Sequence, residues 1–118
     1  MNNITKISEI TYEDLAEYLR LVDAEDEENF LNNILNIAKN FISNYTGRTI
    51  EDLDNYNDLV AVVFVLCQDM YDNRSLYVDK SNINKFIEAT LSLHQINLLW
   101  LTLVNLIKKS LSIERAEG

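Results

Sequence analysis

Nine consecutive apolar residues, LVAVVFVLC at positions 59–67, run directly into QDMYDNR at positions 68–74. The many β-branched residues would suit a buried strand. However, no glycine or proline interrupts the stretch before Arg74, and Asp58 stands where a helix cap is expected. We therefore predict a helix over residues 59–74. Because this helix is apolar on almost every side, other helices must surround it.

The scarcity of helix breakers indicates that the rest of the chain is helical as well. The 118 residues include two glycines and no proline, and Gly47 is the only glycine inside the chain. Hairpins, dinucleotide-binding motifs and phosphate-binding loops require glycine at particular backbone positions, so the sequence disfavours them. We predict one all-α domain over residues 1–118, a compact bundle of about four helices in which the mostly apolar helix is third and central.

Three further helices are expected around the apolar one. Thr11 can cap a short first helix whose first turn is acidic. Residues 30–45 place apolar side chains at helical spacing, and Gly47 can adopt the left-handed conformation that ends a helix. A long C-terminal helix is expected to begin at Ser81 or Asn82, and the first three helices are expected to fold without it.

The charge is distributed unevenly along the chain. Residues 1–58 contain thirteen acidic and four basic side chains, whereas residues 59–118 contain six of each, and the net charge is −9. Because no basic stripe is present to neutralise phosphates, a DNA- or RNA-binding module is disfavoured. The acidic half is instead predicted to repel nucleic acid or to attract a basic protein.

The acidic residues are densest just before the second helix, at Asp23, Glu25, Asp26, Glu27 and Glu28. They lack the glycine and the alternate ligand spacing of a calcium-binding EF-hand loop. We interpret them as a solvated entrance to the helix, where the helix dipole favours negative charge. The alternative interpretation is a patch on which a partner docks.

The reactive side chains do not indicate catalysis. Cys67, the only cysteine, lies inside the apolar run, where burial is expected to raise the pKa of its thiol. His94, the only histidine, has no acidic residue three or four positions away to orient it, so we expect it at a surface or interface. We predict a protein that is not an enzyme and that binds no cofactor and no metal.

Four stretches of the sequence stand in a recognisable order: TYEDLAEYLR leading to VDAEDEE (residues 11–28), AKNFISNYTGR (38–48), DMYDNR (69–74), and NINKFIE leading to HQINLL (82–99). In this order and at this spacing they resemble the small head–tail connector proteins of long-tailed phages. These proteins are also described as head-completion adaptors or DNA-packaging proteins. Residues 100–118 extend beyond the family pattern.

The resemblance implies an all-helical subunit that assembles with copies of itself into a ring, commonly twelve-fold, beneath the phage portal protein. Such a ring extends the DNA channel, through which DNA passes without sequence-specific binding. It also offers a platform for the next head-completion or tail protein. The expected location is the head–tail interface of the virion, after assembly in the host cytoplasm.

Within that role, particular residues are expected to make particular contacts. Arg48, Tyr71 and Arg74 are candidates for contacts between subunits, although Asp69 or Asp72 offers Arg74 a local partner. The acidic cluster is expected on the channel side, where like charge keeps DNA from adhering. The portal contact is expected on the C-terminal helix, through five residues: Phe86, Ile87, Leu91, His94 and Leu98.

Two other classes of protein remain open at the level of sequence. One is a small acidic helical adaptor or regulator whose first half binds a basic protein. The other is a tail-anchored membrane protein, because residues 89–107 are nineteen residues without a formal charge. Seven of these nineteen are polar, and their burial in lipid would be costly, so we expect no membrane insertion.

Overall fold

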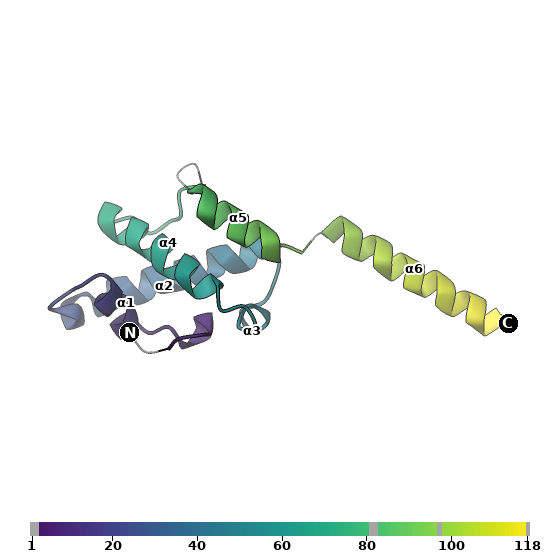
Figure 1. Ribbon diagram of the computed structural model, residues 1–118, viewed down its shortest axis with the longest axis horizontal. Coiled ribbons are helices and arrows are strands. Elements are labelled where there is room, and N and C mark those ends of the chain that lie inside the picture. Colours follow the sequence, from purple (N-terminus) through teal and green to yellow (C-terminus); the bar gives the residue numbers. More distant parts are fainter. Residues whose placement is uncertain (1–2, 81–82, 97, 118) are drawn as a thin grey trace.

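The computed structural model describes residues 3–80, 83–96 and 98–117, except for the side chains of 98–101 and 112–117 (Figure 1). The described residues form helices joined by loops, without any strand. Two 3₁₀ helices are η1 (Ile7–Glu9) and η2 (Ala24–Glu27). The α-helices are α1 (Tyr12–Tyr18), α2 (Glu28–Thr46), α3 (Ile50–Leu53), α4 (Leu59–Asn73), α5 (Lys85–His94) and α6 (Leu98–Glu117). The predicted all-helical class is confirmed for this part of the chain.

Helix α4, formed by the apolar run, lies at the centre of the core. Eight of its residues are buried: Leu59, Val60, Val62, Val63, Phe64, Leu66, Cys67 and Met70. Helices α2, α5, α1 and η1 pack against it. The β-branched residues do not make this run a strand, because burial among helices outweighs a weak local preference. The predicted helix over the run is thus confirmed.

Helix α2 is the most extensive partner of α4 and also contacts α1, α3, α5 and η2. It buries one face, which consists mainly of Leu31, Ile34, Leu35, Ala38 and Ile42. Gly47 follows with φ of +74°, and its N–H donates to the Ser43 carbonyl at 2.9 Å. The prediction that Gly47 ends this helix in the left-handed conformation is confirmed.

Two other helix ends use a left-handed residue that is not glycine. Arg20 follows α1 with φ of +59°, and Arg74 follows α4 with φ of +49°. After Arg20, the N–H of Leu21 donates to the Ala16 carbonyl at 2.9 Å. After Arg74, the N–H of Ser75 donates to the Met70 carbonyl at 3.0 Å. Both hydrogen bonds close the six-residue turn that commonly follows a left-handed helix cap.

The C-terminal region differs from the single long helix that the sequence predicts. Helix α5 ends at His94, the backbone becomes extended at Gln95, and α6 begins at Leu98. The N–H of Ile96 donates to the Thr46 carbonyl at 2.8 Å. This hydrogen bond holds the chain against the end of α2 and explains how a helix ends here without glycine or proline.

Helix α5 belongs to the core of the body. Its cap is Asn84, whose side chain accepts a hydrogen bond from the Ile87 N–H at 2.9 Å, whereas the predicted caps Ser81 and Asn82 lie outside the described residues. Ile87 and Leu91 are buried, and α5 packs on both α2 and α4. The first three predicted helices therefore do not make up the whole core.

Helix α6 projects away from the body formed by the other helices (Figure 1). The molecule measures 69 × 29 × 21 Å, and its radius of gyration is 18.5 Å. A compact chain of this length would have a radius of about 13–14 Å. The molecule is therefore elongated, and α6 accounts for the difference.

Candidate functional site

The first group of predicted contact residues, Tyr71 and Arg74, lies where the end of α4 meets the start of α2. The Arg74 guanidinium pairs with Glu27, with Nη2 and Oε1 2.7 Å apart. The hydroxyl of Tyr71 donates to Oε2 of the same carboxylate at 2.7 Å. Arg74 also lies over the rings of Tyr71 and Phe30, at 4.5 and 5.1 Å from their centroids. These contacts join the start of α2 to the end of α4.

The partner of Arg74 corrects the local prediction. Asp69 and Asp72 were the expected local partners, but the ion pair is with Glu27, which is 47 positions away in sequence. Asp69 instead accepts a hydrogen bond from the side-chain amide of Asn73. Tyr71 and Arg74 thus already have partners within the same chain, which does not favour the expected use of these residues as contacts between subunits.

The same contacts shift the pKa values of Glu27, Tyr71 and Arg74. The hydrogen bond from Tyr71, followed by that from Arg74, lowers the pKa of Glu27 below its usual value of 4.5, although burial opposes this shift. The hydrogen bond to Glu27 raises the pKa of Tyr71, and the bond to the same carboxylate raises the pKa of Arg74. Glu27 therefore helps to hold α2 against α4. The other four residues of the acidic cluster are exposed: Asp23, Glu25, Asp26 and Glu28.

The second group lies at the end of α2, around Arg48. Its Nη1 pairs with Oδ2 of Asp52 at 2.7 Å, and its Nε donates to the His94 carbonyl at 2.6 Å. The guanidinium also lies 5.2 Å from the centre of the Tyr56 ring. Arg48 therefore connects the end of α2 to α3 and to the last residue of α5, all within one chain.

His94 is held in place by residues far from it in sequence. Its Nε2 lies 2.8 Å from Oδ2 of Asp58, and its ring lies 4.3 Å from the ring of Tyr56. Asp58 occupies the cap position of α4, but its side chain makes no capping hydrogen bond there. The expectation that Asp58 caps this helix is therefore replaced by a contact that ties the start of α4 to the end of α5.

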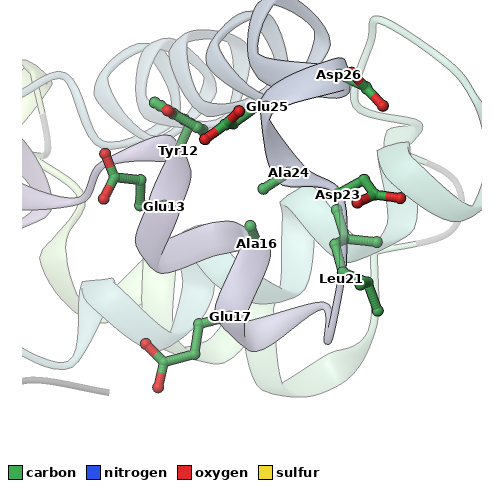
Figure 2. A pocket seen from close by; sticks show the side chains of 10 residues that line it. Tyr12, Glu13, Ala16, Glu17, Leu21, Asp23, Ala24, Glu25 and Asp26 are labelled. Carbon is green, nitrogen blue, oxygen red and sulfur yellow. The ribbon is translucent and has the colours of Figure 1, made fainter.

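An open groove of about 660 Å³ lies between α1 and η2. We call it the acidic groove; its lining residues are Tyr12, Glu13, Ala16, Glu17, Leu21, Val22, Asp23, Ala24, Glu25 and Asp26. Figure 2 shows Ala16 and Ala24 between the two segments, with carboxylates around them. Val22 is 94% exposed. Burial, with the charges of Glu28, Glu13 and Glu25, raises the pKa of Tyr12.

The residues predicted for the portal contact do not share one surface. Phe86 is 55% exposed, whereas Ile87 and Leu91 point into the core and are unavailable to a partner. His94 faces Asp58 and Tyr56. The side chain of Leu98 lies outside the described part of the chain. Of the five residues, Phe86 is the one that the structure places on the surface as a large apolar side chain.

The cysteine behaves as the sequence predicts. Cys67 is buried in α4, its Sγ lies 3.6 Å from the Ile34 carbonyl, and burial raises the pKa of its thiol to about 12. Among the residues that the structure describes, no group of three or more His, Cys, Asp or Glu side chains is arranged to hold a metal ion. Within the same residues, no helix combines the length and the apolar character needed to cross a membrane.

Sequence reasoning missed the acidic groove. It expected a contact surface on the C-terminal helix, but it did not identify which residues of α5 and α6 face outward. Leu93 is 80% exposed, and Leu103, Leu106, Ile107 and Leu111 are exposed to between 46% and 58%. Apolar residues at helical spacing usually face a core, so the pattern alone does not reveal that these face outward. The available signal was the absence of formal charge over residues 89–107, followed by Lys108 and Lys109.

Comparisons with models of protein families, with curated protein sequences and with solved structures found no match for this chain.

Proposed function

We propose that this chain is the subunit of a phage head–tail adaptor. In this role it forms a ring beneath the portal, extends the DNA channel and carries the next head-completion or tail protein. The order and spacing of the four sequence stretches support this role, and the observation that carries it is the exposed apolar surface of α5 and α6. Contiguous exposed apolar surface is costly for a monomer in water, whereas a subunit of an assembly buries it against its neighbours. The role is structural rather than catalytic, and its location is the virion.

The portal contact in this proposal is the outward face of α5. Phe86 and Leu93 lie seven residues apart, which is two helical turns, so they share one side of the helix. Both are exposed, while Ile87 and Leu91 anchor the opposite side in the core. A rigid helix that presents two large apolar side chains is a suitable docking surface for a partner protein.

Co-sedimentation with particles of the portal protein encoded by the same genome tests this assignment. Wild-type protein is expected in the portal pellet, and negative-stain images should show added ring density. Phe86→Asp and Leu93→Asp should each lower binding by at least about tenfold, because they place a charge in an apolar contact. Ser92→Asp adds the same charge one residue from Leu93 and should bind normally. Absence of the wild type from the pellet contradicts the proposed function.

The acidic cluster is proposed to flank the channel and to keep DNA from adhering by like charge. Neutralising Asp23 and Glu28, which are both exposed, tests this without disturbing Glu27, which is needed for the contact with Tyr71 and Arg74. The double variant should slow DNA ejection from assembled particles. Ejection at the wild-type rate would contradict this placement but not the ring itself.

The acidic groove favours a second candidate, a small regulator that binds a basic protein. Its carboxylates are the feature that would attract a cationic partner. A one-to-one complex with a single cationic protein, recovered from the native host and lost in high salt, would favour the regulator over the adaptor.

A further inference from the structure

The described part of α6 presents an apolar stripe with a cation on each side. Leu103, Leu106, Ile107 and Leu111 recur at spacings of three and four residues, so they share one side of the helix. Successive residues of a helix turn by about 100°, which places Lys108 and Lys109 on opposite edges of this stripe. The helix thus carries apolar side chains flanked by positive charge, outside the body of the molecule (Figure 1).

The acidic groove has the complementary arrangement. The exposed Val22 and the half-buried Leu21 and Ala24 provide apolar surface. Carboxylates line both sides: Glu13 on α1, and Glu25 and Asp26 on η2 (Figure 2). An apolar stripe that enters such a groove brings its flanking lysines toward these carboxylates. This is the usual way in which an amphipathic helix is recognised, with the apolar face giving affinity and the charges giving register.

Helix α6 and the acidic groove lie toward opposite ends of one chain (Figure 1). Helix α6 leaves the body where α5 ends, whereas α1 lies toward the opposite end, and α6 points away from it (Figure 1). Residues 1–58 carry a formal charge of −9, whereas residues 59–118 are neutral overall. Electrostatic attraction therefore favours a contact of Lys108 and Lys109 in one copy with the acidic half of another.

We propose that α6 of one copy docks in the acidic groove of the next copy, head to tail. A contact that joins two different surfaces of one chain repeats from copy to copy and closes into a ring when the rotation between copies allows it. This contact specifies how the subunits of the ring proposed above would be joined, and it rests on that proposal. Its two surfaces lie on this chain alone, so it can be tested without a portal.

Disulfide trapping with two single-cysteine additions tests the direction of the contact. Val22→Cys marks the groove and Ile107→Cys marks the helix, while the native Cys67 is buried and does not interfere. Under mild oxidation, a mixture of the two variants should yield mainly the mixed disulfide. A predominant Ile107→Cys homodimer would mean that α6 pairs with α6, and the absence of any disulfide-linked dimer would mean no self-contact. Either result overturns the proposal.

Charge reversal measured by sedimentation velocity tests the role of the flanking charges. The K108E/K109E variant should raise the dissociation constant of self-association by at least about tenfold, because it places like charges at the rim of the groove. The K80E/K85E variant changes the net charge equally at exposed sites away from α6 and should behave as wild type. Mixing K108E/K109E with E25K/D26K should restore association. Unchanged association of K108E/K109E overturns the proposal.

Portal binding separates this contact from the proposed function. If K108E/K109E still decorates portals with a complete ring, the adaptor function stands and the docking of α6 is wrong. If the mixed disulfide forms but wild-type protein does not bind portals, the docking of α6 stands and the adaptor function is wrong.

Discussion

Arg20 and Arg74 occupy left-handed backbone positions that glycine usually takes at helix ends. In this conformation the Cβ of an ordinary residue lies close to the following carbonyl, at a cost of about 1 kcal/mol. Arg74 has contacts that offset this cost, since its guanidinium meets Glu27 and two aromatic rings. The side chain of Arg20 is exposed. The backbone strain is therefore offset by side-chain contacts at Arg74, whereas at Arg20 the exposed side chain offers no comparable compensation.

Replacing the two arginines by glycine should have different effects on stability. Arg20→Gly should raise the free energy of unfolding by about 0.5–1 kcal/mol, because glycine adopts positive φ without strain, although it also gains freedom in the unfolded chain. Arg74→Gly removes the same strain but also loses the ion pair with Glu27, so its gain should be smaller or absent. Urea denaturation of both variants measures the difference, and an equal gain at the two positions would contradict this account.

The Glu27 contact should make stability depend on pH. The pKa of Glu27 is lowered by its hydrogen bonds with Tyr71 and Arg74, so its contribution is present above the unfolded pKa near 4.5 and is lost as the pH falls through the lower, folded pKa. Glu27→Gln should therefore be less stable than wild type at pH 7, and the two should converge in more acidic solution. Thermal unfolding between pH 7 and pH 3 measures this. A difference that persists unchanged at pH 3 would contradict the shift. Glu25→Gln is the matched control and should follow wild type throughout.

At the scale of elements, local patterns predicted the longer helices well. Thr11 forms the expected cap of α1, with Asp14 completing a reciprocal pair of hydrogen bonds, and Gly47 ends α2. The break between α5 and α6 was missed, because it arises from the hydrogen bond between Ile96 and Thr46 rather than from a breaker residue. Contacts between distant parts of the chain leave no local sequence signal.

The candidate site was predictable only in part, for the same physical reason. The acidic cluster could be identified from sequence. The contact of Glu27 with Tyr71 and Arg74 could not, because these two residues lie at the end of another helix. His94 was interpreted from its nearest neighbours, whereas its partner Asp58 is 36 positions away. Residue type and spacing indicate which groups carry charge, and only packing determines which of them remain available.

Truncation should separate the roles of α5 and α6. A chain that ends at Ile96 keeps α5 and its core contacts, so it should unfold at nearly the wild-type temperature. A chain that ends at Asn82 loses Ile87 and Leu91 from the core and should not fold cooperatively. Circular dichroism and thermal melts measure both. A cooperative melt of the shorter chain near the wild-type temperature would contradict the place of α5 in the core.

Two point variants test the same element more finely. Leu91→Ala should lower the free energy of unfolding by about 2–5 kcal/mol, because it leaves a cavity in the core. Phe86→Ala, in the same helix, should change it by no more than about 0.5–1 kcal/mol, because the ring is more than half exposed. Chemical denaturation compares the two, and equal losses would contradict the assignment of the two faces of α5.

At the scale of the whole molecule, the elongated shape can be measured directly. Small-angle X-ray scattering of a dilute sample should give a radius of gyration near the 18.5 Å of the structure. The chain that ends at Ile96 should give about 12–13 Å, the value for a compact body. A value near 13 Å for the full chain would mean that α6 folds back on the body.

With increasing concentration, the radius of gyration of the wild-type protein should grow, while that of K108E/K109E should not.

The contact between Arg48 and the His94 carbonyl fixes the last turn of α5, next to the point where α6 leaves the body. A helix of 20 residues is about 30 Å long. It therefore acts as a lever, and a rotation of about 10° at its base moves its tip by about 5 Å. A small change in the packing of Arg48 would thus become a large change in where the tip of α6 lies. In the ring proposed above, Arg48 would therefore influence the curvature without touching a neighbouring copy.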